Sequence, residues 1–224
     1  LGLRLLMETR AEDIVRDADL LADYRQAGIL HIYVGLEATD QARLDAFGKG
    51  LTVEISRAAI HRMAEAGIVS ETSFILGLPH ETIETVEATY AASVQYDPDF
   101  AHYLAIAPWP YAGLASEMSP YLESRDYSEY NLVTPVARSR AMSRGEIFAG
   151  LLSCYKRFYM RRLARLDKIR DPFRRDYLIR SMKVMLRSSF LQKHLGGLGK
   201  MPACVERALA RAGTPESDAA WISK

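Results

Sequence analysis

Short apolar segments alternate with amphipathic segments along the first half of the chain. Four of the apolar segments have the length and composition of buried strands: Leu3–Thr9, Ile29–Leu36, Ile68–Leu78 and Phe100–Ala107. Between them, apolar residues recur at the three- and four-residue spacing of a helix face: Ile14, Ala18, Leu21 and Tyr24; Ile55, Ala59 and Met63; Ile83, Val86, Tyr90 and Val94. Strands that alternate with helices predict a parallel sheet.

Local signals mark the ends of these elements. Thr9 and Glu12 have the spacing of a capping box, so the first helix is expected to begin there and to end at Gly28. Thr52 to Ala66 forms the second predicted helix, which Gly67 closes, and Thr82 to Gln95 forms the third. The tripeptide Ala-Gly-Ile recurs after 39 residues, but the repeat lacks the second helix that a helical solenoid needs.

The pattern changes after Pro110. Residues 111–140 are predicted to be loops and turns, and two helices follow, one from Arg144 and one around Phe173–Leu186. The polar surface of the second helix is expected to carry Arg174, Arg175, Arg180, Lys183 and Arg187. Glycines at 196–199 should end it, and residues 212–224 are predicted to be a loose tail. We therefore expect segments 1–115 (α/β), 116–140 (connecting loops), 141–200 (basic helices) and 201–224 (helix and tail).

Composition and charge narrow the class of protein. The 224 residues are 49% hydrophobic and 25% charged, which is typical of a globular protein, and no apolar run is long enough to span a membrane. The net charge is −12 in residues 1–136 and +13 in residues 137–200. Two cysteines, Cys154 and Cys204, cannot form a disulfide framework or a four-thiolate metal site, so we expect a reducing, cytoplasmic setting and no metal site within this chain. Because residue 1 is leucine, we expect a fragment of a longer protein.

Candidate binding residues follow the predicted strands. Ligands of parallel α/β sheets bind at the carboxyl ends of the strands. Those ends carry Glu8 and Arg10, then Glu37, then Ile75 and Gly77, then Trp109 and Tyr111, and Lys49 lies in a turn after the second strand. The carboxylates suit ligand hydroxyl or ammonium groups, and Lys49 suits a ligand carboxylate. Taken singly, the carboxylates and Lys49 are better explained as ordinary turn residues, and the aromatic residues could belong to the core. Only their order along successive strands points to a site.

Several motifs resemble those of a known enzyme family. Gly35–Ala38, the Lys49 turn and Phe74–Thr82 resemble the cobalamin-dependent branch of the radical S-adenosylmethionine (SAM) enzymes. Met7–Asp17, Ala107–Pro110, Arg125–Pro135 and Tyr155–Tyr159 further resemble the anaerobic magnesium-protoporphyrin IX monomethyl ester oxidative cyclases. The segment 125–135 is the most specific part, because radical SAM proteins in general do not carry it.

The resemblance implies a fold, cofactors and roles. The fold would be a partial TIM-like (β/α) radical SAM barrel, represented by its last four strands and followed by a helical region. SAM, a [4Fe–4S] cluster and cobalamin would be the cofactors, although the CxxxCxxC loop and the cobalamin domain are absent from this chain. Glu37 would contact the ribose or amine of SAM and Lys49 its carboxylate. Glu8 and Arg10 would orient SAM or substrate, and Ile75–Gly77 would lie near the adenine. Trp109 and Tyr111 would border a porphyrin.

The resemblance predicts a cyclase of (bacterio)chlorophyll synthesis whose fragment is inactive alone. Two alternatives stay open. One is another cobalamin-dependent radical SAM methyltransferase. The other is a non-catalytic module whose basic helices, residues 144–195, bind an acidic partner or a membrane surface. Nucleic acid is not expected as a partner, because the basic helices lack the aromatic interleaving of known nucleic-acid folds.

Overall fold

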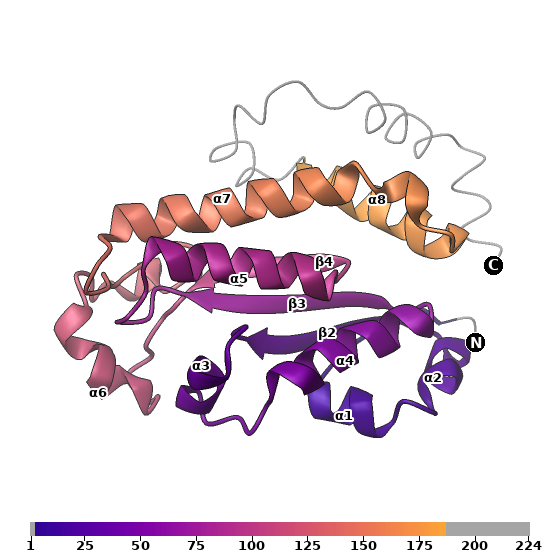
Figure 1. Ribbon diagram of the computed structural model, residues 1–224, viewed down its shortest axis with the longest axis horizontal. Coiled ribbons are helices and arrows are strands. Elements are labelled where there is room, and N and C mark those ends of the chain that lie inside the picture. The colour runs from indigo at the N-terminus through magenta and orange to yellow at the C-terminus, as the bar shows by residue number, and fades with distance from the viewer. Residues whose placement is uncertain (1–2, 187–224) are drawn as a thin grey trace.

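The computed structural model describes residues 3–186 and has a four-stranded parallel sheet at its centre. The strands are β1 (Leu5–Thr9), β2 (Ile29–Glu37), β3 (Val69–Leu76) and β4 (Phe100–Ala105), in the order β1-β2-β3-β4. The helices are α1 (Ala11–Arg16), α2 (Leu21–Ala27), α3 (Gln41–Ala46), α4 (Val53–Glu65), α5 (Ile83–Tyr96), α6 (Leu114–Met118), α7 (Arg144–Leu163) and α8 (Pro172–Leu186). In Figure 1 the strands point toward α6, and α8 lies at the opposite end. The predicted parallel α/β fold is confirmed.

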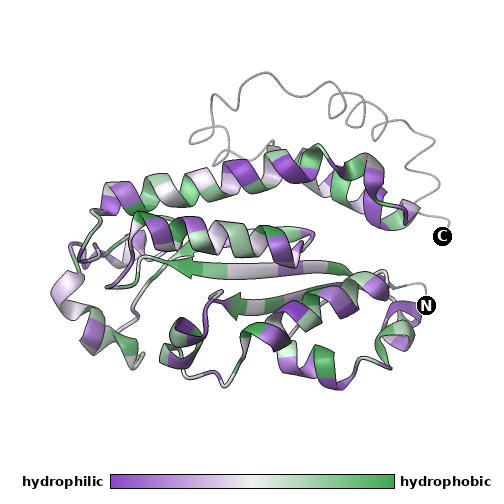
Figure 2. Cartoon of the chain, in the orientation of Figure 1, coloured by the Kyte–Doolittle hydropathy of each residue, from purple (hydrophilic) through white to green (hydrophobic). Residues whose placement is uncertain are grey.

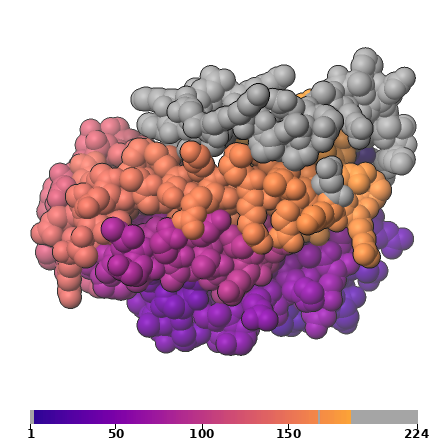
Figure 3. All heavy atoms as spheres, turned by 45° about the horizontal axis from the view of Figure 1, so that its top comes forward, coloured from indigo at the N-terminus to yellow at the C-terminus, as the bar shows by residue number. Residues whose placement is uncertain are grey.

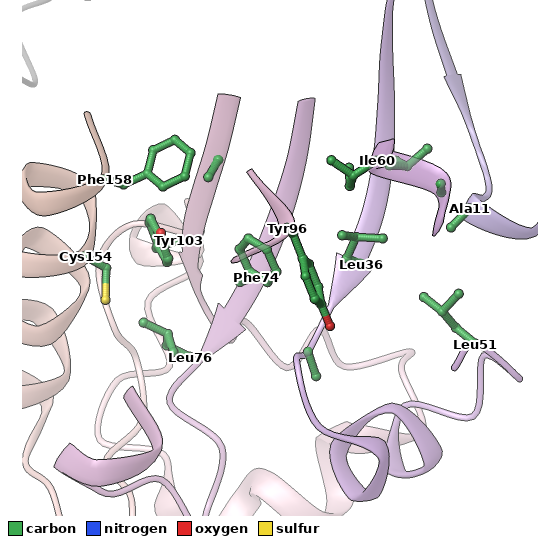
Figure 4. Packing of buried hydrophobic residues seen from close by; sticks show 14 of the residues in the cluster. Ala11, Leu36, Leu51, Ile60, Phe74, Leu76, Tyr96, Tyr103, Cys154 and Phe158 are labelled. Atoms are coloured by element: carbon green, nitrogen blue, oxygen red, sulfur yellow. The ribbon is translucent and has the colours of Figure 1, made fainter. Parts of the chain in front are cut away.

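One face of the sheet carries the main hydrophobic core. Alternate residues of β2, β3 and β4, such as Leu36, Phe74 and Tyr103, are fully buried against helices α4, α5 and α7. Figure 4 shows Phe74 between Tyr103 and Tyr96, with Cys154 and Phe158 of α7 beyond Tyr103. The strand residues of opposite parity face the other way. In the described structure, Tyr33, Glu71 and His102 in the middle of this face stay partly exposed, and we call it the uncovered face.

Most predicted helix ends are confirmed, with one correction. Thr52 and Thr82 cap α4 and α5 through their hydroxyl groups, and Gly28 adopts the left-handed conformation after α2. The capping box at Thr9 is wrong, because Arg10 is the N-cap of α1 and the Thr9 hydroxyl donates to the carboxylate of Asp13 instead. The single helix expected to run to Gly28 is also broken by a turn at residues 17–20.

The edge of β4 is closed by later segments of the chain. The hydroxyl of Tyr159 on α7 donates to the carbonyl of Ala101, 3.1 Å away, and the amide of Ala105 donates to the carbonyl of Leu132 at 2.7 Å. The region 111–140, expected as loops, contains the short helix α6 and two 3₁₀ turns. Residues 125–135 are thereby fixed to the end of the sheet, because an unpaired strand edge needs partners for its backbone groups.

The predicted basic helices form part of the same body. Figure 2 shows hydrophilic and hydrophobic residues alternating along α7 and α8, and Figure 3 shows both helices as a layer directly on the earlier part of the chain. Arg174, expected on the polar surface, instead donates to Oδ2 of the fully buried Asp99 at 2.7 Å. Arg162 donates to Oδ1 of Asp99 at 2.5 Å. A buried carboxylate needs such partners, so this prediction for Arg174 was wrong.

Ion pairs also account for part of the charge split between the two halves. Arg157 pairs with Glu87, and Arg162 pairs with Asp97 as well as Asp99. Positive charges from the helices therefore neutralise negative charges from the sheet region. The predicted break at 196–199, the tail at 212–224 and Arg187 lie outside the described residues.

Candidate functional site

A cavity of about 560 Å³ opens at the carboxyl ends of β1 and β2. It is lined by Glu8, Thr9, Arg10, Ala11, Glu12, Tyr33, Gly35, Glu37, Gly48, Lys49 and Leu51. Four of the residues proposed from the sequence, Glu8, Arg10, Glu37 and Lys49, are therefore brought together. The cavity volume lies within the range of small-molecule sites in proteins.

Opposite charges are paired across this cavity. The ammonium group of Lys49 donates to Oε1 of Glu37. The guanidinium of Arg10 donates to the backbone carbonyl of Lys49 at 3.0 Å and to Glu12 at 2.6 Å. Arg10 thus ties the Lys49 turn to the start of α1. The result is a polar wall with two cations and three carboxylates, which suits a ligand that carries charges of both signs.

The backbone around Glu37 is shaped to present its carboxylate. Glu37 has a left-handed φ of 62°, and the pairing of β2 with β3 shifts register between Gly35 and Glu37. A Cβ atom on Gly35 would lie 2.5 Å from Oε1 of Glu37 and 3.6 Å from Nζ of Lys49. Glycine at 35 therefore leaves room for the ion pair to lie over the backbone, and strain at a non-glycine residue is typical of functional sites.

Ile75 and Gly77 do not line this cavity. The amide of Gly77 donates to Oε2 of the buried Glu81 at 3.0 Å, and Oε1 of Glu81 accepts from Arg43 at 2.8 Å. The side chain of Ile75 packs in a small cluster with Leu78 and Met118. Gly77 has a φ of 92° and sits in the turn that ends β3. In this structure both residues shape the strand end.

Several polar residues on the uncovered face of the sheet were not proposed from the sequence. The hydroxyl of Tyr33 lies 2.7 Å from Oγ of Ser73, and Glu71 lies between His31 and His102. Burial raises the pKa of Tyr33. Two-residue alternation along β2, β3 and β4 places these side chains on the face opposite Val34, Phe74 and Tyr103, so the signal was present in the strand pattern.

Aromatic residues from two distant segments meet beyond the end of β4. The Trp109 ring lies 6.3 Å from that of Tyr111, nearly parallel to it, and 5.3 Å from that of Tyr130, which in turn lies 5.2 Å from Tyr127. We call these four residues the aromatic cluster. Tyr111 is 86% exposed and Tyr127 60% exposed, whereas Tyr130 is buried. Trp109 and Tyr111, both proposed from the sequence, are thus joined by the segment 125–135, which sequence reasoning had singled out without assigning it a contact.

Metal ligands and membrane spans were also sought in the described part of the chain. Within residues 3–186, His, Cys, Asp and Glu side chains form no group of three suited to a metal ion. Burial raises the pKa of the Cys154 thiol to about 12, so it is a poor ligand. None of the helices between residues 3 and 186 combines the length and apolarity needed to cross a bilayer.

Comparison with known proteins shows which sequences this chain resembles. Residues 1–92 match the model of the radical SAM superfamily. The chain is 39% identical over 202 residues to the anaerobic magnesium-protoporphyrin IX monomethyl ester cyclase of Rubrivivax gelatinosus, which covers 89% of this chain and 36% of that protein. It is 41% identical over 183 residues to the cyclase of the same name from Cereibacter sphaeroides, covering 81% of this chain and 30% of the relative. The chain spans about a third of the length of these curated relatives.

A solved structure shares the fold. The cobalamin-dependent S-adenosylmethionine radical enzyme OxsB superposes with a TM-score of 0.52 at 15% identity, covering 93% of this chain and 37% of OxsB. At that identity the likeness concerns the fold alone. The sequence match shows that residues 1–92 are part of a radical SAM domain, and the solved structure adds that the fold is shared.

Proposed function

We propose that this chain is part of an oxidative cyclase that forms the isocyclic ring of (bacterio)chlorophyll from magnesium-protoporphyrin IX monomethyl ester under anaerobic conditions. Two relatives that match most of the chain at 39% and 41% identity carry the name of this cyclase. The observation that carries the proposal is the aromatic cluster, in which Trp109 of the β4 exit contacts Tyr130 of the segment 125–135. The two segments that resemble the cyclases most specifically therefore build one surface.

The cavity at β1 and β2 suits SAM. SAM has a carboxylate and an ammonium group on its methionine, a positive sulfonium and two ribose hydroxyls. Lys49 would hold the carboxylate, and Glu37 the ammonium group or the ribose, with Glu8 and Arg10 orienting the ligand. The Lys49–Glu37 pair keeps both charges in place until a ligand of mixed charge replaces each partner. When bound, SAM would supply a 5′-deoxyadenosyl radical, and these residues would only hold and orient it.

The aromatic cluster suits a porphyrin. A planar macrocycle buries a large apolar area, and exposed aromatic rings such as Tyr111 and Tyr127 offer flat surfaces for it. The cluster lies at the same end of the sheet as the cavity, because both follow the carboxyl ends of parallel strands. Substrate and SAM would therefore meet at one end of the barrel.

The described part of the chain offers no set of ligands for the other expected cofactors. A [4Fe–4S] cluster needs at least three thiolates, and Cys154 is a single buried thiol. Residues 3–186 therefore do not fit the cluster, and other residues of the full-length protein would have to supply its ligands. Cobalamin, which OxsB binds, would likewise be held by another domain.

The decisive test is turnover by the full-length protein under anaerobic conditions. The protein, loaded with iron and cobalamin, is given the monomethyl ester, SAM and a low-potential reductant, and the pigments and 5′-deoxyadenosine are separated chromatographically. Formation of the five-membered ring with 5′-deoxyadenosine supports the cyclase. Transfer of a methyl group to the porphyrin or another acceptor would establish the methyltransferase alternative instead.

A further inference from the structure

A chain of four polar side chains crosses the uncovered face of the sheet. His102 Nε2 on β4 lies 2.5 Å from Oε1 of Glu71 on β3, and His31 Nε2 on β2 lies 3.0 Å from the other oxygen, Oε2. Nδ1 of His31 lies 2.9 Å from the hydroxyl of Tyr177 on α8. Residues from three strands and from α8 thus assemble the group. Tyr177 lies 146 residues after His31 in the chain. None of these residues belongs to the cavity at β1 and β2.

The ionisation of Glu71 determines where the protons lie. Burial raises the pKa of the Glu71 carboxyl, but the hydrogen bond with His102 and the nearby His31 outweigh it and bring the pKa down to about 2. Glu71 is therefore a carboxylate, which accepts hydrogen bonds and donates none. Nε2 of His102 must carry the proton that faces Glu71. In the neutral ring, Nδ1 then has a free lone pair.

This arrangement is that of a base with an orienting carboxylate. A carboxylate behind an imidazole fixes its tautomer and stabilises the imidazolium that forms when the other nitrogen accepts a proton. His31 approaches the second oxygen of Glu71 through Nε2, and the hydroxyl of Tyr177 lies against Nδ1 on the far side of the His31 ring. His31 is buried beneath α8, whereas 32% of the His102 side chain is exposed. Of the two imidazoles, His102 is the one that a ligand can reach.

His102 also faces the same space as the proposed SAM site. Ser73 of β3 pairs in register with His102, and its hydroxyl lies 2.7 Å from that of Tyr33, which lines the cavity. His102 and the cavity wall formed by β2 are two strand spacings apart, on the order of 10 Å. A substrate that extends from the aromatic cluster over the uncovered face would lie between them.

We propose that His102 is the proton acceptor for the substrate, with Glu71 as its positioning residue, an inference that rests on the proposed cyclase function. Closing a ring and forming a carbonyl group by oxidation removes protons as well as electrons from the substrate. In the step assigned here, a substrate C–H or O–H bond breaks, its electron pair stays on the substrate, and the proton forms a new N–H bond at Nδ1 of His102. Glu71 neutralises the resulting imidazolium until the exposed ring returns the proton to solvent.

The test separates SAM cleavage from product formation in the full-length protein. In His102→Gln we expect ring formation to fall about 100-fold or more, as for loss of a general base, while 5′-deoxyadenosine formation stays within about threefold of the wild-type rate. The matched control is His61→Gln, because His61 is 72% exposed on α4 and also pairs with a glutamate, Glu65. The control should change neither rate.

Glu71→Gln tests the positioning role through pH. The groups around Glu71 are His31 and Tyr33 on β2, His102 on β4, Tyr155 and Tyr159 on α7, and Tyr177 on α8. Removing the negative charge behind His102 makes its imidazolium less stable, so the acid limb of the pH–rate profile for ring formation should move to lower pH. Histidine-selective ¹⁵N NMR of the protein without cofactors should show Nε2 protonated in neutral His102, and Glu71→Gln, whose neutral amide oxygen is a weaker acceptor, should reduce that preference.

Each outcome decides between the two proposals. If the wild type forms the ring and His102→Gln does so within threefold, or if its SAM cleavage falls in parallel with ring formation, the role of His102 is wrong while the cyclase stands. If the wild type cleaves SAM but forms no ring, the cyclase proposal fails and the role of His102 fails with it. A wild-type NMR spectrum with Nδ1 protonated would also overturn the assignment.

Discussion

The two faces of the parallel sheet are built from the same strands but do different work. The covered face is closed by helices and is mainly apolar, with Leu36, Phe74 and Tyr103 fully buried. The opposite face carries Tyr33, Glu71 and His102, and residues 3–186 close it only at its two ends. Because neighbouring strand residues point to opposite faces, one strand supplies stability and chemistry at the same time. Substitutions at adjacent positions should therefore separate the two roles.

The largest effect is expected from the covered face. Phe74→Ala removes a fully buried ring between Tyr96 and Tyr103 and should lower the free energy of unfolding by about 3–5 kcal/mol. Ser73→Ala, at the next position on the other face, removes only one hydrogen bond to Tyr33 and should cost about 1 kcal/mol. Urea unfolding of the full-length protein measures both. Equal losses would mean that the two faces do not differ in this way.

A substitution in the cavity should have the second-largest effect, and it should change activity rather than stability. Glu37→Ala leaves Lys49 without its partner and removes a charged contact proposed for SAM, so SAM cleavage should fall about 10- to 100-fold. Glu65→Ala, on the exposed surface of α4, is the control and should leave the rate unchanged. The measurement is 5′-deoxyadenosine formation at saturating reductant. Unchanged cleavage in Glu37→Ala would remove Glu37 from the SAM site.

A substitution in the aromatic cluster should weaken binding of the substrate and leave binding of SAM unchanged. Trp109→Ala removes the ring that joins Tyr111 to Tyr130, and KM for the porphyrin should rise roughly tenfold, the equivalent of one aromatic contact. Trp109→Phe keeps an aromatic ring and should recover most of the affinity. The KM for SAM, measured in the same assays, should not change. A parallel rise in both values would show that Trp109 supports the barrel end as a whole.

The smallest effect expected is a pH-dependent one from Glu71. Its pKa is lower in the folded protein, about 2, than the ordinary value of 4.5, so its contribution to stability is present above pH 4.5 and is lost as the pH falls toward 2. Glu71→Gln should therefore be less stable than the wild type by on the order of 1 kcal/mol at pH 6, with the gap narrower at pH 3 and closing near pH 2. Thermal unfolding at these pH values measures it. A gap that widens in acid would contradict the sign.

Local signals were sufficient where neighbours in sequence are also neighbours in space. Thr52, Thr82 and Gly28 end their helices as predicted, because a cap depends on only three or four residues. The same reasoning failed at Thr9, where Asp13 competes for the hydroxyl and Arg10 takes the cap position. Strand alternation could also have identified Glu71 and His102 as residues of one face, although not as partners.

Family motifs indicated the cavity residues, but only the fold decided which of them meet. Register across parallel strands brings Glu8 and Arg10 beside Glu37 and Lys49. The backbone amide of Gly77 instead donates a hydrogen bond to Glu81. Pairings that span long stretches of chain, such as Arg174 with Asp99 or Tyr177 with His31, leave no local pattern. The physical reason is that a strand or helix is specified by nearby residues, while the partner of a buried charge is specified by how distant elements pack.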